Sequence, residues 1–208
     1  MMDFKKEIKL AFTENKLAIS ISIAILLISL LAGYFLEPYL NAYLNPVVDN
    51  MAEQVHSGNI QLTFHSIFSN NIRIVFIMFI MGILCCFSAV ILAFNGLFIG
   101  YFTAIQDDLF ATLLMLVPHG IFELPACVIA CASGFVLFNF ILRFFKTFIK
   151  QEDGSFSTQL YSSYVDNFDK LKQAILLLLV AAVLMVIAGV VEVYLTGPIA
   201  KFILSVFS

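Results

Sequence analysis

Long hydrophobic runs, separated by short polar stretches, dominate the sequence. A helix needs about 20 apolar residues to cross a bilayer, and the first run, 17–36, has that length. The pattern therefore predicts an all-α fold: one membrane domain over 1–208, built as a polytopic helix bundle of about five spans with short interfacial helices. The expected membrane segments are 17–36, 72–94, 95–106, 109–142 and 173–195.

The other segments are polar enough to lie outside the bilayer. Residues 1–16 combine lysines with apolar residues at helical spacing, which predicts an amphipathic helix on the cytoplasmic surface. Residues 37–71 are expected to form an outer segment. Residues 143–172 are expected to form a cytoplasmic loop that contains a second short interfacial helix.

The positions of the basic residues predict the orientation. Nine of the eleven Lys and Arg residues lie in 1–16 and 143–172, whereas the segment 37–71 has none. Because basic segments stay on the cytoplasmic side, we expect a multi-pass protein of the cell membrane with a cytoplasmic N-terminus and an outer C-terminus. In the alternative, 95–124 is a re-entrant hairpin that never completes its crossing. That path puts 143–172 on the wrong side for its charge and ranks second.

Composition excludes several classes of protein. The chain is 62% hydrophobic and 12% charged, far from the balance of a soluble domain. No basic patch outside the spans favours nucleic acid. All four cysteines lie inside hydrophobic runs, so a disulfide framework is not indicated. Cys127 and Cys131 share a helix face, and we interpret them as small packing residues rather than as ligands of a soft metal.

The fourth expected span, 109–142, contains helix-breaking residues. Pro118 and Gly120 flank a histidine, and Pro125 follows within two turns. Such residues are tolerated in a membrane helix where neighbouring groups satisfy the freed backbone. We therefore predict a broken or re-entrant helix here, with the break near the middle of the membrane.

Two ionisable residues follow this predicted break. In a helix that starts at Pro118, His119 and Glu123 are four residues apart on one face, and an ionisable side chain inside the membrane is by default a functional-site hypothesis. With Asn95 as a further polar partner, they are expected to form a ligand-binding core or a structural tie. No third metal ligand is evident beside His119, so neither a metal nor a cofactor is expected. Glu192, near the outer end of the last span, is expected to be solvated or paired.

Two stripes of small residues predict close helix packing in the membrane. We expect the third and fourth spans to cross tightly through these faces, within one chain or in an oligomer. The stripes are Gly96 and Gly100 on one span, and Ala126, Ala130 and Gly134 on the other.

Three motifs resemble those of a known family. They are Phe68-Ser69-Asn70-Asn71, Asn95-Gly96-Leu97-Phe98-Ile99-Gly100 and Pro118-His119-Gly120-Ile121-Phe122-Glu123-Leu124-Pro125-Ala126. Together with the expected five spans, they resemble the stage II sporulation protein M family of integral membrane proteins, over nearly the whole chain. The resemblance implies a multispan protein. It also implies kinship with a namesake that is a membrane partner of two cell-wall hydrolases and not itself a hydrolase.

The function expected from these features is that of a non-enzymatic integral membrane protein that scaffolds or anchors partner proteins. The partners expected are the lipid bilayer, a second copy of the chain and cell-envelope proteins, and no nucleic acid. The alternative is a transporter or channel for a small solute or ion, with a mid-membrane site at His119 and Glu123. A third class, an intramembrane enzyme or metal protein, needs a third ligand near His119.

Overall fold

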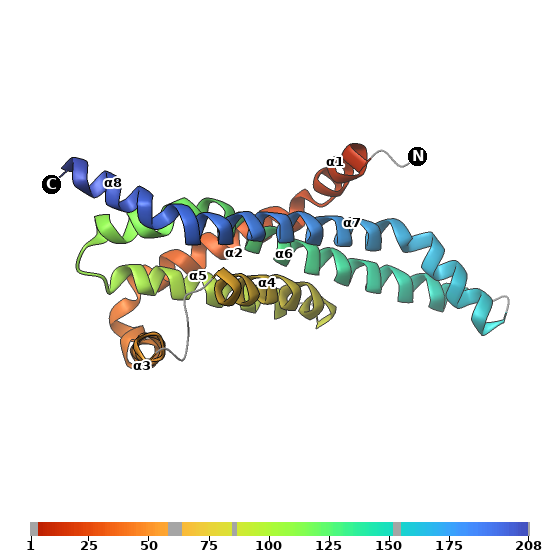
Figure 1. The fold of residues 1–208 in the computed structure, drawn as a ribbon. Helices are drawn as coiled ribbons and strands as arrows, with labels where there is room; N and C mark the ends of the chain where they lie inside the picture. Colours follow the sequence, from red (N-terminus) through yellow and green to blue (C-terminus); the bar gives the residue numbers. More distant parts are fainter. Residues whose placement is uncertain (1–3, 58–63, 85–86, 152–154, 208) are drawn as a thin grey trace.

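Helices make up the described part of the chain, as the hydrophobic pattern predicts (Figure 1). The structure, a computed structural model, describes residues 4–57, 64–84, 87–151 and 155–207, and no strand occurs within these ranges. The all-α fold is therefore confirmed. The elements are α1 (Phe4–Glu14), α2 (Lys16–Phe35), α3 (Glu37–His56), α4 (Phe64–Met81), the 3₁₀ turn η1 (Gly82–Leu84), α5 (Phe87–Ala104), α6 (Leu109–Lys150), α7 (Phe156–Val191), the π-helix η2 (Glu192–Thr196) and α8 (Gly197–Phe207).

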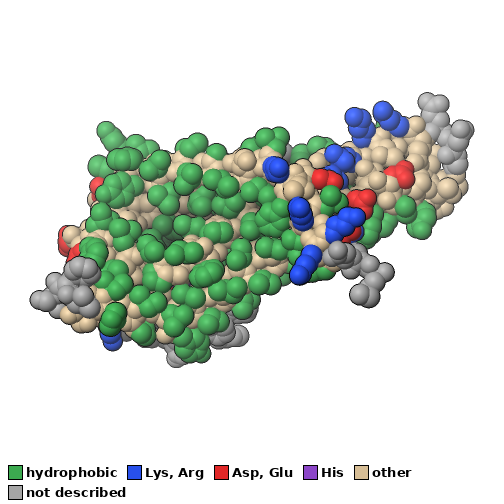
Figure 2. All heavy atoms as spheres, turned by 90° about the horizontal axis from the view of Figure 1, so that it is seen from above, with side chains coloured by type: hydrophobic (Ala, Val, Ile, Leu, Met, Phe, Trp, Pro, Cys, Tyr) green, Lys and Arg blue, Asp and Glu red, His purple; other side chains and the backbone are tan. Residues whose placement is uncertain are grey.

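Several of these helices are suited to a bilayer. Within the described residues, four helical stretches are long and apolar enough to cross a membrane: Lys16–Phe35, Phe87–Ala104, Leu109–Lys150 and Phe156–Ser205. A shorter apolar helix covers Ser69–Leu84. Figure 2 shows the result on one face, where a broad band of hydrophobic side chains meets a group of mixed charges toward one end. The chain is thus a multi-pass membrane protein.

The second and third membrane segments meet at a different place from the one expected. The structure ends α4 at Met81 and begins α5 at Phe87, whereas the sequence pattern suggested a boundary between 94 and 95. The turn was missed because it is made of apolar residues and contains no polar punctuation. As a result α5 is a full 18-residue helix, and the re-entrant path over 95–124 is not formed. Cys85 and Cys86 lie outside the described residues.

The predicted break in the fourth span is also absent. Helix α6 runs as one element of 42 residues through both Pro118 and Pro125. A proline inside a helix removes one backbone hydrogen bond and favours a kink, but the neighbouring turns keep theirs. Residues 126–134 just beyond are buried without interruption, so packing holds the helix together. Within the loop expected at 143–172, α6 continues to Lys150 and α7 begins at Phe156, so the two helices form a hairpin.

The two small-residue stripes pack on different neighbours and not on each other. A Cβ atom at Gly100 would overlap the Leu30 carbonyl oxygen of α2, and one at Gly33 would overlap the Leu97 carbonyl oxygen of α5. The Gly96–Gly100 stripe therefore lets α5 approach α2. At Gly134 an added Cβ would overlap the Ser88 hydroxyl at the start of α5. Spacing reveals that a stripe is closely packed, but it does not reveal which helix lies against it.

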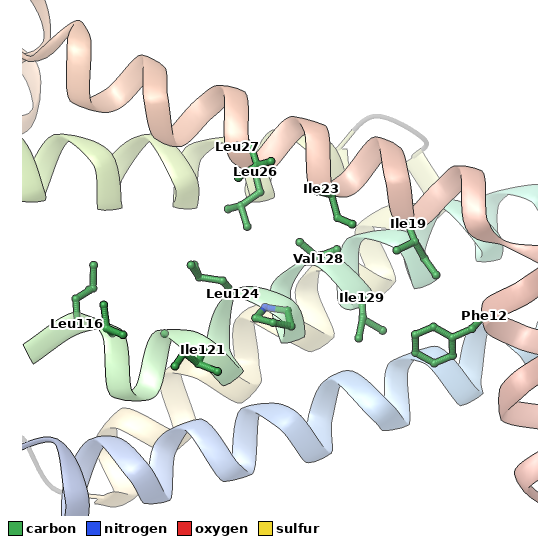
Figure 3. A pocket seen from close by; sticks show the side chains of 13 residues that line it. Phe12, Ile19, Ile23, Leu26, Leu27, Leu116, Ile121, Leu124, Val128 and Ile129 are labelled. Carbon is green, nitrogen blue, oxygen red and sulfur yellow. The ribbon is translucent and has the colours of Figure 1, made fainter. Parts of the chain in front are cut away.

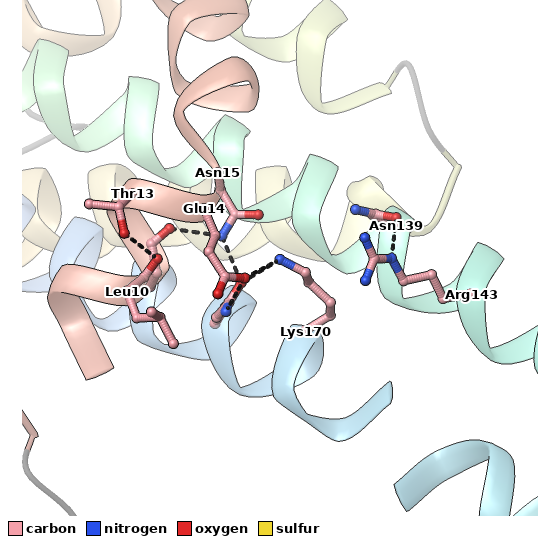
Figure 4. Close-up of polar contacts among 9 residues, drawn as sticks. Leu10, Thr13, Glu14, Asn15, Asn139, Arg143 and Lys170 are labelled. Carbon is pink, nitrogen blue, oxygen red and sulfur yellow. Dashed lines mark hydrogen bonds and ion pairs between the residues drawn. The ribbon is translucent and has the colours of Figure 1, made fainter. Parts of the chain in front are cut away.

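A polar network joins α1 to α7 at one end of the membrane helices (Figure 4). Lys170 Nζ lies 2.8 Å from Glu14 Oε2, and Lys172 Nζ lies 2.7 Å from Glu7 Oε2. The hydrogen bonds from Lys170 and Gln173 to Glu14 lower the pKa of this carboxyl below its ordinary value. These contacts hold the amphipathic helix α1 against α7.

Candidate functional site

His119 and Glu123 lie on the same face of α6, one turn apart. Because α6 continues through Pro118, their helical spacing is maintained, and His119 Nε2 lies 4.0 Å from Glu123 Oε2. Their side chains are 13% and 20% exposed. The structure thus brings the expected pair together on a continuous helix rather than at a break.

A third ionisable residue completes this cluster. Glu192 is the first residue of η2, at the end of α7. One ligand atom from each of His119, Glu123 and Glu192 lies within 4.8 Å of the other two. Sequence reasoning missed Glu192 as a partner because the contact joins residues far apart in the chain. The available signal was that Glu192 is the single acidic residue in the last span, 173–195.

Thr196 lies beside the second ring nitrogen of His119. The Thr196 hydroxyl is buried, donates a hydrogen bond to the Val191 carbonyl oxygen at 3.1 Å and lies 3.5 Å from His119 Nδ1. With its hydrogen directed to Val191, the Thr196 oxygen can accept a hydrogen bond from His119 Nδ1, and the roles in this contact depend on the tautomer of the ring. In the tautomer that carries the proton on Nδ1, the Nε2 lone pair faces Glu123.

The π-helix η2 is the local feature that shapes this side of the cluster. The backbone of Glu192–Thr196 is π-helical, and the Thr196 side-chain hydroxyl reaches the Val191 carbonyl oxygen five residues earlier. Short π-helical turns occur frequently at functional sites. Here the turn contributes both Glu192, at its first residue, and Thr196, at its last.

Asn95 belongs to a neighbouring contact and not to the ring of His119. Its Nδ2 donates to the Cys127 sulfur at 3.3 Å, so it ties α5 to α6 one turn beyond Glu123. Cys127 and Cys131 are free and buried. This agrees with their interpretation as packing residues.

The electrostatics of the cluster are unusual for membrane helices. Within the described residues, neither Glu123 nor Glu192 forms an ion pair with a lysine or an arginine. Two carboxyl groups close together in an apolar environment repel each other and lose hydration when ionised. The arrangement can hold protons on the carboxyl groups, or it can bind a cation between them.

A separate groove beside the cluster has no such chemistry. It is lined by apolar side chains of α1, α2 and α6, among them Phe12, Ile23, Leu124 and Val128, and it has a volume of about 560 Å³ (Figure 3). No polar side chain lines it, so nothing there can orient a polar ligand.

The α6–α7 hairpin extends beyond the network that holds α1. Ring contacts between the two helices connect Phe140 with Tyr164, at 6.5 Å between centroids, and Phe148 with Phe156, at 5.5 Å. Other large apolar side chains of the hairpin point outward. They are Leu142, Phe145, Ile149, Leu160, Tyr161 and Val165.

Comparison with known proteins places this architecture in a family. The model of the family described as Stage II sporulation protein M matches residues 22–197. A protein of Methanocaldococcus jannaschii named "Uncharacterized protein MJ0706" is 28% identical over 215 residues, which cover 99% of this chain and 92% of the relative. A second protein of that organism, "Uncharacterized protein MJ0793", is 32% identical over 152 residues, covering 71% of this chain and 78% of the relative. No solved structure matches. The chain belongs to the Stage II sporulation protein M family.

Proposed function

We propose that the protein is a non-enzymatic membrane anchor that holds partner proteins through the α6–α7 hairpin. The observation that carries the proposal is the length and surface of this hairpin. Helix α6 has 42 residues, which is about 63 Å of helix, whereas the hydrocarbon core of a bilayer is about 30 Å thick. A large part of α6 therefore lies outside the membrane.

The network around Glu14 and Lys170 supports a position for the membrane boundary. Charged pairs of this kind belong in the headgroup region or in water, and α1, which supplies Glu14, has the pattern of an interfacial helix. Residues 143–151 and 155–168, farther along the hairpin, then project into the aqueous phase. Exposed apolar side chains grouped on a protein in water mark interaction sites. Ile149, Phe156 and Tyr161 are 77%, 70% and 71% exposed.

The rings packed between the two helices support a preformed docking element. Phe140 of α6 meets Tyr164 of α7 with centroids 6.5 Å apart, and Phe148 of α6 meets Phe156 of α7 at 5.5 Å. Such contacts stabilise the hairpin before a partner arrives, so less conformational entropy is lost on binding.

The proposed orientation places this hairpin in the cytoplasm, together with the N-terminus, and the C-terminus outside. The basic residues of both segments support it through the positive-inside rule. The pair α4–α5 also supports this orientation. Two antiparallel membrane helices return the chain to the side from which it came, so α6 begins on the same outer side as α4. Helices α6 and α7 then lead into and out of the cytoplasm.

Site-specific photocrosslinking in cells tests the anchoring role. A photoreactive residue at Ile149 or Phe156 should give a discrete crosslinked protein. The matched control is Phe35, the last residue of α2, which is 71% exposed and lies outside the hairpin. A product whose peptides come from this chain alone, at twice the chain mass, identifies a second copy as the partner, and a product that contains peptides of another protein identifies a different partner. Absence of any product from both hairpin positions overturns the proposal.

The alternative function is a transporter or channel for a small solute or ion, and the cluster of His119, Glu123 and Glu192 within the membrane helices favours it. Flux through liposomes distinguishes the two. Substantial flux by the purified protein, abolished in Glu123→Gln, supports transport and contradicts a purely anchoring role.

A further inference from the structure

The membrane cluster contains the donors of a transition-metal site. His119 presents a ring nitrogen, and Glu123 and Glu192 present carboxylate oxygens, all within 4.8 Å of one another. Imidazole nitrogen together with carboxylate oxygen suits divalent ions such as Zn²⁺. Lysine and arginine do not compete for the carboxylates among the described residues.

The ligand atoms, which lie within 4.8 Å of one another, must move closer together to coordinate one ion. Ligand atoms about 2.1 Å from a tetrahedral zinc lie about 3.4 Å apart, and His119 Nε2 and Glu123 Oε2 are 4.0 Å apart. Rotation of the carboxyl groups can close the remaining distance. The backbone positions are already set by α6 and by the π-helix η2.

Thr196 is the independent observation that points to a ligand. A metal-bound histidine almost always donates its other ring N–H to an oxygen, which fixes the tautomer. The buried Thr196 hydroxyl lies 3.5 Å from His119 Nδ1, and its own hydrogen is directed to Val191. In the tautomer that donates from Nδ1 to Thr196, the lone pair of Nε2 is directed toward the carboxylate side.

We infer that His119, Glu123 and Glu192 form a binding site for one divalent transition-metal cation, of which Zn²⁺ is the representative. Three protein ligands leave a fourth position for water or a further ligand. The cation neutralises two carboxylates that would otherwise repel each other inside the membrane helices. It also ties α6 to the end of α7. The inference is independent of the anchoring function of the hairpin.

Metal titration of the full chain in detergent is the direct test. The purified, metal-free protein is titrated with Zn²⁺ alone, and binding is followed by calorimetry and by elemental analysis. We expect one Zn²⁺ per chain and a higher unfolding temperature in its presence. Glu192→Gln and His119→Gln should each weaken binding at least about tenfold, because each removes a ligand. The control Glu37→Gln, which makes the same charge change at the start of α3, should bind as the wild type does.

Cobalt spectroscopy identifies the donor atoms. Co²⁺ should bind with the visible absorption of a site made of nitrogen and oxygen ligands. Binding at Cys127 or Cys131 instead would add a thiolate charge-transfer band and would contradict the assignment. Thr196→Val keeps the three ligands and the shape of the side chain, and it should weaken Zn²⁺ binding by about 10- to 100-fold.

Two results would overturn the metal site. Wild-type protein that is folded by circular dichroism and binds no Zn²⁺ overturns the inference, as does unchanged binding in both Glu192→Gln and His119→Gln. Should a ligand variant fail to fold, the Co²⁺ spectrum of the wild type and the Thr196→Val titration decide. Hairpin crosslinks at Ile149 are unaffected by any of these results, so failure of the metal site and failure of the anchoring role are distinguishable.

Discussion

Asn15 Nδ2 donates a hydrogen bond of 2.9 Å to Gln173 Oε1, across 158 positions of the chain. Both side chains are buried, at the point where α1 and α2 meet α7. Gln173 also donates to Glu14 Oε2 at 2.9 Å and accepts from Lys170 Nζ at 2.8 Å. The Gln173 amide therefore joins Asn15, Glu14 and Lys170 where the amphipathic helix closes onto the bundle, and the Lys172–Glu7 pair is a separate contact.

Gln173→Leu should destabilise the protein by about 1–3 kcal/mol, because the buried Asn15 amide loses an acceptor and Glu14 loses a donor. Unfolding in a denaturing detergent titration measures the change. Gln54→Leu, at an exposed position of α3, is the control and should change stability little. A loss at position 173 no larger than that of the control would show that the network contributes nothing.

Acid should loosen α1 from α7. The pKa of Glu14 is lowered in the folded protein, chiefly by the hydrogen bond from Lys170. The contact therefore stabilises the fold fully above the ordinary pKa of 4.5 and is lost as pH falls through the lowered pKa. Because the carboxylate is 44% exposed, its contribution stays below about 1 kcal/mol.

Distance measurements between spin labels can detect this release. Labels at the exposed positions Lys5 and Asp166 report on α1 and α7. The distance distribution should be narrow at neutral pH and should broaden in acid. Glu14→Gln should already be broadened at neutral pH and respond less to acid. A wild-type distribution that stays narrow throughout contradicts the role given to Glu14.

Alanine at two helical glycines should have opposite effects on stability. At Gly100 the new Cβ would overlap the Leu30 carbonyl oxygen, a backbone atom that cannot move without separating α5 from α2. Gly100→Ala should therefore destabilise the protein by about 1–3 kcal/mol, as overpacking does. At Gly120 nothing lies within 4 Å of the new atom, so Gly120→Ala should stabilise α6 by up to about 1 kcal/mol. Thermal unfolding of the two variants side by side measures both signs.

The hydrophobic pattern predicted most of the architecture. Runs of membrane length gave the helices, and lysine positions gave the amphipathic α1. The turn between α4 and α5 could not be predicted from polar turn residues, because the sequence between Gly82 and the start of α5 is apolar. The prolines had the opposite effect on the prediction. Pro118 and Pro125 predicted a break that the structure does not have, because local hydrogen bonds and burial keep α6 continuous.

The candidate site was predictable only as far as local spacing reaches. His119 and Glu123 could be paired because four residues make one helical turn. Glu192 and Thr196 could not be added, since their approach depends on how α7 packs against α6 and on the π-helix η2. The partner of Asn95 was likewise decided by packing, which brings Cys127 and not His119 within hydrogen-bonding distance.

Thiol labelling of intact cells should settle the orientation. Asp107 and Asp166 are exposed, near opposite ends of the membrane helices α6 and α7. With Asp107→Cys, an impermeant reagent should label the protein in intact cells. With Asp166→Cys, labelling should require permeabilised cells, because the hairpin is expected in the cytoplasm. The wild type, with its native cysteines alone, is the background control. The reverse pattern would mean an inverted protein whose hairpin meets partners outside the cell, and labelling of both positions from one side would mean that α6 does not cross the membrane.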